Sequence, residues 1–155
     1  MNIRKVEEKD IPQVLNLLLQ VLEIHRQLRP DIFNENVTKY SYEDILEMID
    51  DEDRPVFVMV ENDKVLGYAF CEIRVTKYPH LLKKQKGLYL SDLCVDEKCR
   101  RQGVGEALLK YVIEYAKSRG CQELTLNSWA DNDPANNFYK KMGLKVRAST
   151  FEYLL

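Results

Sequence analysis

The chain has 155 residues, of which 45% are hydrophobic and 31% are charged, and its formal net charge is −2. This length supports one hydrophobic core of substantial size, so we expect a single domain over residues 1–155. The mild acidity argues against a protein that coats nucleic acid or an anionic membrane, because those partners require a strong positive field.

The four cysteines, at positions 71, 94, 99 and 121, contain no CxxC pair. We therefore expect buried free thiols, with neither a metal site nor disulfides. The N-terminal residues lack the apolar core of a signal peptide, and no window approaches the roughly 20 apolar residues of a membrane span. These features predict a cytoplasmic protein without a nucleic-acid or membrane partner.

The first half of the chain combines helix start signals with alternating strands. Asp10 and Ser41 are suitable N-caps for apolar residues at helical spacing. Gly67 interrupts a β-prone run and indicates a bulge or a close backbone approach. The elements predicted in order are a strand over 2–7, a helix over 11–28, a second helix after Ser41, and a hairpin with strands 55–60 and 65–75.

The second half alternates strands and helices. Gly120 and Gly143 are suitable helix ends, and Pro134 suits a first helical turn. The elements predicted in order are a surface loop over 78–87, a strand over 88–95, a helix to Arg119, a strand over 123–127, a helix over 134–142 and a final strand over 145–153. A strand–helix–strand unit of this kind is right-handed, so strands 88–95 and 123–127 are expected to be parallel.

The turn after residue 95 places cations beside glycines, in the order Arg100, Arg101, Gln102, Gly103, Val104 and Gly105. Bare backbone N–H groups at a helix start can bind a phosphate, so a diphosphate ligand is expected. A Walker loop needs Lys and then Ser or Thr after the second glycine, and a Rossmann turn needs GxGxxG. Neither pattern is completed, and Arg100-x-x-Gly103-x-Gly105 remains.

This pattern resembles the acetyl-CoA signature of the GNAT superfamily, the GCN5-related N-acetyltransferases: Arg or Gln, two residues, Gly, one residue, then Gly or Ala. Asn132, Ala135, Tyr139 and Gly143 match a second family pattern, N-x-x-A-x-x-h-Y-x-x-x-G-F, in which h is apolar. The chain departs at Leu144, where the family usually has Phe, and this change concerns packing. The resemblance implies an α/β (α+β) GNAT fold, in which about four helices flank a mixed sheet of six to seven strands whose parallel central strands splay.

The resemblance also implies an acetyl-CoA-dependent N-acetyltransferase that acts on a primary amine by direct attack in a ternary complex. Small size, mild acidity and the candidate carboxylates favour a small cationic acceptor, such as a polyamine, an amino acid or an aminoglycoside-like amine. Two alternatives remain: a protein N-terminus or lysine as the acceptor, or a non-catalytic acyl-CoA-binding sensor. A homodimer is expected because relatives commonly pair.

The family's donor site assigns roles to main-chain groups. A bulged central strand would direct an amide near Cys94 or Val95 at the acyl carbonyl, and Leu93 and Val95 would bond the pantetheine arm as a strand does. Asn132 is the best side-chain contact for that arm. The residues expected to bind acetyl-CoA are Leu93, Cys94, Val95, Arg100, Arg101, Gln102, Gly103, Val104, Gly105, Glu106, Asn132, Ala135 and Tyr139.

Proton transfer requires an acid and a base. The family position of the acid is Tyr139, whose phenol, with a pKa of about 10, can protonate a departing thiolate. Polyamine acetyltransferases of the superfamily often carry Leu-Glu-Asp in the central strand, whereas this chain has Leu90, Ser91 and Asp92 and lacks the first acid. Asp92 is the first candidate for the base and Glu72 the second, and a plain surface carboxylate is the simpler alternative for each.

Overall fold

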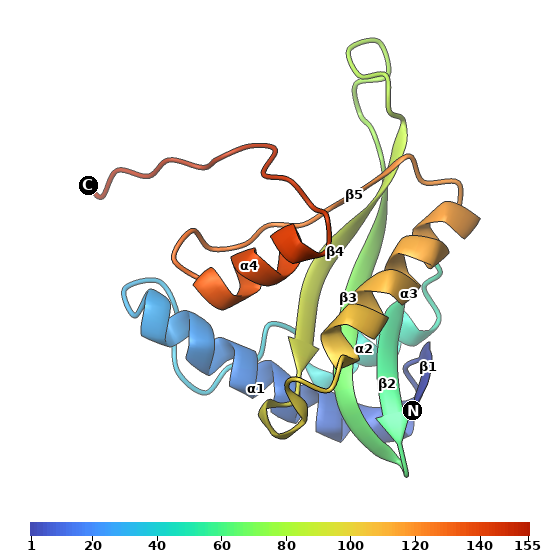
Figure 1. Ribbon diagram of the computed structural model, residues 1–155, viewed down its shortest axis with the longest axis vertical. Helices are drawn as coiled ribbons and strands as arrows, with labels where there is room; N and C mark the ends of the chain where they lie inside the picture. The colour runs from blue at the N-terminus through green and yellow to red at the C-terminus, as the bar shows by residue number, and fades with distance from the viewer.

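The computed structural model describes residues 1–155, and a five-stranded sheet forms its centre (Figure 1). The strands lie in chain order, β1-β2-β3-β4-β5, and every neighbouring pair is antiparallel except β4 and β5, which are parallel. The strands are β1 Asn2–Lys5, β2 Val56–Glu61, β3 Lys64–Val75, β4 Lys86–Val95 and β5 Glu123–Thr125.

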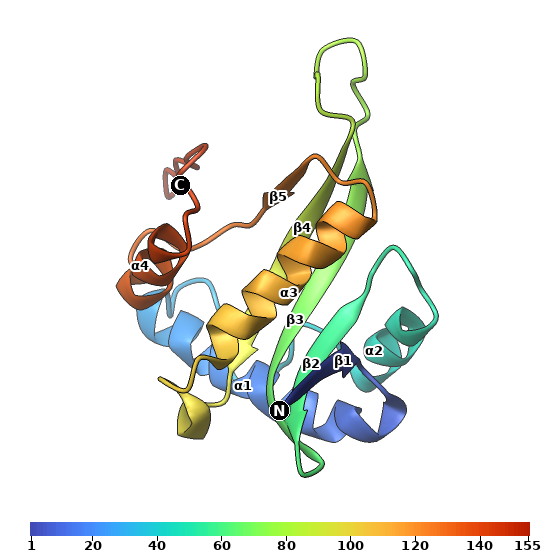
Figure 2. The same cartoon turned by 45° about the vertical axis from the view of Figure 1, so that its right-hand side comes forward.

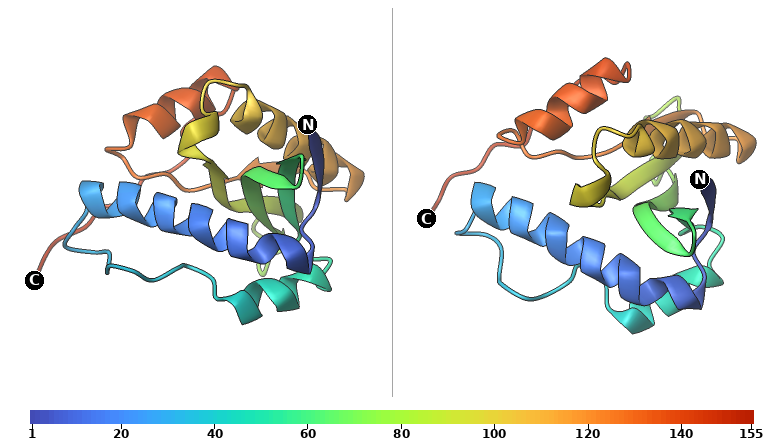
Figure 3. Two further views of the ribbon diagram at one scale, coloured as in Figure 1. Left: turned by 90° about the horizontal axis from the view of Figure 1, so that it is seen from below. Right: turned by 60° about the horizontal axis from the view of Figure 1, so that its bottom comes forward.

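Four α-helices accompany the sheet: α1 Ile11–Leu28, α2 Tyr42–Ile49, α3 Val104–Ser118 and α4 Asp133–Lys141. Helix α3 lies across β3 on one face (Figure 2), and α1 and α2 lie on the opposite face (Figure 3). Each face therefore has its own hydrophobic core, one built with α1 and α2 and the other with α3. We call these faces the α1 face and the α3 face.

Local signals explain most of these elements. Ser41 caps α2 by accepting a hydrogen bond from the Asp44 N–H at 3.0 Å, as expected. Asn62 and Asp63 have φ values of 50° and 61°, which suit the tight turn of the β2–β3 hairpin. The hairpin and the bounds of α1 agree with the prediction, and Cys71, Cys94, Cys99 and Cys121 are free thiols.

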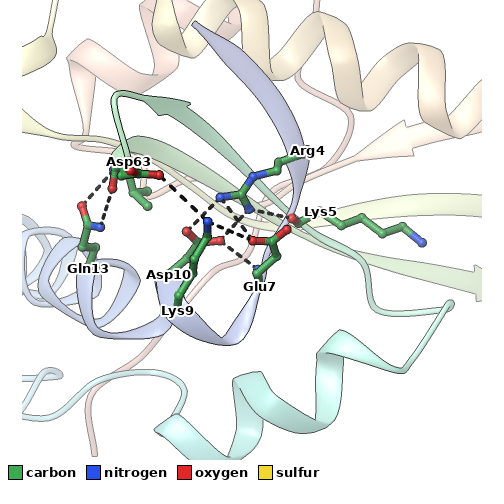
Figure 4. A network of polar contacts seen from close by, with 8 residues as sticks. Arg4, Lys5, Glu7, Lys9, Asp10, Gln13 and Asp63 are labelled. Carbon is green, nitrogen blue, oxygen red and sulfur yellow. Dashed lines mark hydrogen bonds and ion pairs between the residues drawn. The ribbon is translucent and has the colours of Figure 1, made fainter.

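Asp10 precedes α1 as expected, but its side chain does not cap the helix (Figure 4). The buried carboxylate instead accepts two hydrogen bonds from Arg4, at 2.6 and 3.1 Å, and one from the Glu7 N–H at 2.8 Å. Burial raises the pKa of Asp10 and is the largest single influence, but the hydrogen bonds from Arg4 and the Glu7 N–H, together with the charges of Arg4 and Lys9, outweigh it, so the net pKa is lowered. This contact fixes β1 against the start of α1.

Two expectations about strands are wrong. The sheet has five strands rather than six to seven, and β5 covers only three residues. Residues 145–153 form no strand, because no neighbouring strand pairs with them and every residue from 145 to 155 is exposed. Local alternation favours an extended conformation, but a strand also requires a partner. No helix in the structure combines the length and the apolar character that crossing a membrane would need.

Candidate functional site

The glycine-containing turn forms the N-terminus of α3. Gly103 is the N-cap residue in a left-handed conformation with φ 78°, and Arg101 is also left-handed with φ 67°. The first N–H with a helical partner is that of Ala107, which donates to the Gly103 carbonyl at 3.0 Å, and no backbone bond is made by the N–H groups of residues 102–106. Arg100 and Arg101 are exposed and form no ion pair. Free donors and cations at the positive end of a helix can bind an anion.

The turn is fixed from two sides. Asp96 is buried and accepts from the Lys98 N–H at 3.0 Å, and Gln20 of α1 accepts from the Glu97 N–H at 3.1 Å. A Cβ at Gly67 would lie 2.7 Å from the Cys94 carbonyl oxygen and 3.1 Å from Val104 Cγ1. The predicted close approach at Gly67 is therefore confirmed, and it allows β3, the end of β4 and the first turn of α3 to pack together.

Strand β4 contains a bulge at Ser91. Leu90 pairs with Cys71 and Asp92 with Phe70, so Ser91 is the extra residue, and its hydroxyl donates to the Phe70 carbonyl at 3.0 Å. The bulge reverses the alternation of β4. Before it, Leu88 and Leu90 point to the α3 face, and after it Leu93 and Val95 do so. The bulge therefore places Asp92 on the α1 face, with Phe70 as its cross-strand neighbour.

Beyond the bulge, one side of β4 has no strand partner. The last pair between β4 and β5 is Tyr89 with Thr125, after which the two strands diverge (Figure 1). The Asp96 N–H donates to Leu66 of β3 at 2.8 Å. The N–H and C=O groups of successive residues in a strand point to opposite sides. Those of Leu93 and Val95 therefore point away from β3, whereas those of Cys94 point toward β3. Leu93 and Val95 thus fit the expected donor contacts, and Cys94 does not present its amide to that side.

The carboxyl group of Asp92 is half-buried among side chains of the α1 face. Burial raises its pKa to about 6, while the charge of Lys39 and the hydroxyl of Tyr68 act in the opposite direction. Lys39 Nζ donates to the Ser91 carbonyl at 2.8 Å. The Tyr68 hydroxyl lies close enough to influence the pKa of Asp92, yet it is fully buried and no hydrogen bond of acceptable geometry reaches it. A carboxylate that titrates near neutrality can accept a proton during a reaction.

Tyr139 is the candidate proton donor, as Asp92 is the candidate proton acceptor. It is half-buried on α4, and its ring makes an edge contact with Phe138 at 5.3 Å between centroids. Burial, assisted by the charge of Asp92, raises the pKa of Tyr139 to about 12. The phenol therefore keeps its proton at neutral pH, as a proton donor must. From α4, the Tyr139 side chain packs against the α3-face core.

The other predicted residues are placed less centrally. The Glu72 carboxylate is 42% exposed and pairs with Arg74 at 3.2 Å, so it lies in solvent and already has a cationic partner. Asn132 caps α4 by accepting from the Ala135 N–H at 3.4 Å, which leaves its amide NH₂ group free. The Glu106 side chain pairs with Lys110 at 2.9 Å, so only its main chain faces the anion-binding end of α3.

Sequence reasoning missed an aromatic group that joins three segments. Phe33 lies 5.2 Å from His25 of α1 and 5.5 Å from Trp129 of the β5–α4 connection, measured between ring centroids. Arg29 lies over the Trp129 ring at 5.9 Å. Burial, with the charge of Lys39, lowers the pKa of His25. No local signal in the sequence links these positions. The bulge could have been located, because apolar residues occupy even positions up to Leu90 and odd positions from Leu93.

Comparison with known proteins decides the family. A sequence profile described as "Acetyltransferase (GNAT) family" matches residues 19–144, which is most of the chain. The chain belongs to the GNAT family. Its mixed α+β architecture, with strands that diverge after a bulge beside the glycine-containing turn, is the GNAT fold, and membership identifies this GNAT domain as an acyltransferase of the N-acetyltransferase class.

Three relatives illustrate the range of similarity. N-alpha-acetyltransferase 30 of Schizosaccharomyces pombe is 29% identical over 99 residues, which are 64% of this chain and 63% of the yeast protein. Thialysine N-epsilon-acetyltransferase of Bos taurus is 26% identical over 151 residues, covering 91% of this chain and 82% of the bovine protein. The crystal structure of a mutant of the BH1408 protein from Bacillus halodurans is 30% identical with a TM-score of 0.94, covering 100% of this chain and 99% of that one.

Proposed function

We propose that this GNAT domain transfers the acetyl group of acetyl-CoA to the primary amine of a small molecule, by direct attack in a ternary complex. The observation that carries the proposal is the combination of two groups in one site. Asp92 lies on β4 directly after the bulge, and Tyr139 lies on α4; burial raises the pKa of the carboxyl group to about 6 and that of the phenol to about 12. Acyl transfer to an amine needs one group that accepts a proton and another that supplies one.

The donor half of the proposal rests on main-chain groups. The N–H groups of residues 102–106, with Arg100 and Arg101, would hold the pyrophosphate at the start of α3. Leu93 and Val95 would bond the pantetheine arm as a strand does, and Asn132 would add a side-chain contact from the other wall. Acetyl-CoA is a substrate here and supplies an activated thioester. Residues that fit its anionic and amide groups are thus present on both sides of the diverging strands.

The chemical half assigns one role to each of two side chains and one amide. Asp92 would accept the proton that the amine loses, directly or through water, and Glu72 is a weaker second choice because it is exposed and paired with Arg74. The Val95 N–H would stabilise negative charge on the carbonyl oxygen, which leaves the Val95 carbonyl group for the pantetheine arm. Tyr139 would give its proton to the sulfur when the carbon–sulfur bond breaks, and water would later restore it.

The acceptor class rests on the surroundings of Asp92. The carboxyl group is half-buried under Lys39 and aromatic rings, which suits a compact amine better than a polypeptide. The bovine relative that covers most of the chain is named for thialysine, a small amine, and this supports the same choice. Similarity to N-alpha-acetyltransferases from yeast and Sulfurisphaera tokodaii favours a protein N-terminus as the second candidate. A cytoplasmic location, supported by four free cysteines, completes the proposal.

The test is release of free thiol from acetyl-CoA across a panel of polyamines, amino acids, aminoglycosides and N-terminal peptides. Tyr139→Phe should lower kcat by about 100-fold or more while acetyl-CoA affinity, measured by calorimetry, changes little, because only a proton donor is lost. Phe138→Leu is the neighbouring control and should leave the proton donor in place. Equal losses of kcat and affinity in Tyr139→Phe would refute the acid assignment. Absence of acetyl-CoA binding by the unaltered protein would refute the whole proposal.

A further inference from the structure

Lys39 is a cation held at the bulge of β4 without a carboxylate partner. Its ammonium group donates to the Ser91 carbonyl at 2.8 Å, and its side chain is exposed and forms no ion pair. The contact with the carbonyl uses one N–H, whereas an ammonium group has three. Two donors and a positive charge therefore remain available beside Asp92, which follows Ser91 in the strand.

The segment that carries Lys39 is fixed against the sheet. The Thr38 hydroxyl donates to the Tyr40 carbonyl at 2.6 Å, and the Tyr40 ring stacks on Phe70 with the ring centroids 4.6 Å apart. Lys39 Nζ lies 5.4 Å from the centroid of the Tyr40 ring. Phe70 is also the cross-strand neighbour of Asp92. The position of the ammonium group is therefore set by the same packing that surrounds Asp92.

The other acids of the neighbouring segments already have cationic partners. Every acid of residues 19–41 and of β3 lies in an ion pair: Glu23 and Glu35 with Arg26, Asp31 with Arg29, and Glu72 with Arg74. Asp92 forms no ion pair, even with Lys39. One unpaired carboxyl group and one unpaired ammonium group are thus held at consecutive residues of β4.

Unpaired charges of opposite sign discriminate between classes of amine. A polyamine or an aminoglycoside with one amine at Asp92 would bring further ammonium groups toward Lys39, where like charges repel and no other unpaired carboxylate is present. An amine that also carries a carboxylate matches both charges. That carboxylate could accept charge-assisted hydrogen bonds from the two free N–H groups of Lys39.

We propose that Lys39 binds an acid group of the acceptor, so that the acceptor is an amine of the amino-acid class, with a carboxylate at a short distance from the amine. This inference rests on the proposed function, because it places the reacting amine at Asp92. Lys39 determines specificity and takes no part in proton transfer. Polyamines, aminoglycosides and protein N-termini lack a carboxylate in this fixed relation to the amine, so they are disfavoured as acceptors.

The first test measures acceptor binding without turnover. The full chain is saturated with coenzyme A, which carries no acetyl group, and is titrated in a calorimeter with lysine, ornithine and glycine and with the carboxamide of each. The carboxamide keeps the amines and replaces the negative charge by a neutral group. At least one amino acid should bind about tenfold or more tightly than its carboxamide, as a hydrogen-bonded charge pair provides. No preference for the acid in any of the three pairs would overturn the proposal.

The second test repeats the titrations with charge variants and adds kcat/KM for acetylation of each pair. Lys39→Gln should bring the ratio of acid to carboxamide close to one, Lys39→Glu should reverse it, and Lys39→Arg should preserve it. Because each variant is compared with the unaltered protein on the same pair, intrinsic differences between the two amines cancel. Lys5→Gln is the control, since Lys5 is exposed, forms no ion pair and lies in β1, at the far edge of the sheet from β5.

The outcomes separate this inference from the proposed function. If Lys39 only ties its segment to Ser91, Lys39→Gln should weaken the acid and the carboxamide equally, and an unchanged ratio would overturn the inference. Acetylation of both members of each pair at equal rates would also overturn it, while acetyl transfer to small amines would stand. Binding of acids that depends on Lys39, without acetylation of any amine, would support the acid site and refute the proposed transfer.

Discussion

Gly103 and Gly120 provide a matched test of the anion-binding turn. They flank the same helix, α3, and both are left-handed, with φ values of 78° and 73°. A Cβ at either position would meet no atom within 4 Å, so alanine causes no steric clash at either end. Gly103→Ala and Gly120→Ala therefore share one conformational cost and differ only in whether the affected N–H groups face the proposed pyrophosphate.

The expected magnitudes separate stability from binding. A left-handed non-glycine residue costs roughly 1–2 kcal/mol, so each variant should lower Tm by about 2–8 °C in a protein of this size. In Gly103→Ala, relaxation of φ would also turn an N–H away from the phosphate, and a hydrogen bond to a charged group is worth about 1.5–3 kcal/mol. Affinity for acetyl-CoA should then fall by at least about tenfold in Gly103→Ala and stay unchanged in Gly120→Ala.

Two measurements check this expectation. Thermal unfolding of both variants establishes that their losses of stability are comparable, and calorimetric titration with acetyl-CoA compares their dissociation constants with that of the unaltered protein. If Gly103→Ala binds acetyl-CoA as tightly as Gly120→Ala does, the main-chain amides at the start of α3 are not the pyrophosphate site.

Two further substitutions probe the α1 face. The pKa of Asp92, about 6, lies above its unfolded value of about 3.9, so the stability it contributes is complete below about pH 4 and is lost as pH rises through 6. Asp92→Asn should therefore raise the free energy of unfolding at pH 8 by roughly 1–2 kcal/mol. The same variant should lower kcat and abolish the rise in rate through pH 6. A lower Tm of the variant at pH 8 would contradict this reasoning. The buried Tyr68 hydroxyl has no hydrogen bond of acceptable geometry, so at pH 4, where Asp92 is neutral, Tyr68→Phe should leave stability unchanged or raise it by about 1 kcal/mol in denaturant titrations. Tyr115→Phe is the comparison, because it loses the 2.7 Å hydrogen bond that Arg119 donates to the Tyr115 hydroxyl, and it should lower the free energy of unfolding. Equal losses of stability in Tyr68→Phe and Tyr115→Phe would show that the Tyr68 hydroxyl has a partner.

Sequence alone was sufficient where short-range chemistry determines structure. The bounds of α1, the Ser41 cap and the β2–β3 turn follow from residues within one or two turns of each other. The glycine-containing turn is equally local, because a strand, a charged bend and a helix start are consecutive in the chain. Gly67 indicated a bulge or a close approach in the same way, but only the folded structure shows that the approaching groups belong to Cys94 and Val104.

The remaining features depend on contacts between distant residues. The placement of Asp92 follows from the single extra residue at Ser91, which reverses which face each later side chain of β4 occupies. Lys39 reaches the bulge from a segment without clear periodicity, and only the folded structure brings it there. Residues 145–153 alternate as a strand does, but a strand also needs a partner, and no strand of this chain pairs with them.

The divergence of β4 and β5 has a thermodynamic consequence for the resting protein. Leu93 and Val95 expose main-chain donors and acceptors that an ordinary sheet would saturate, so water must satisfy them until a ligand arrives. A coenzyme arm bonded there would act as a removable sixth strand. Its occupancy would add about 2.7 kcal/mol of stability at a concentration about 100 times its dissociation constant. The lifetime of this protein in a cell would then follow the local supply of acyl-CoA. A melting temperature recorded in plain buffer would describe only the protein without bound coenzyme.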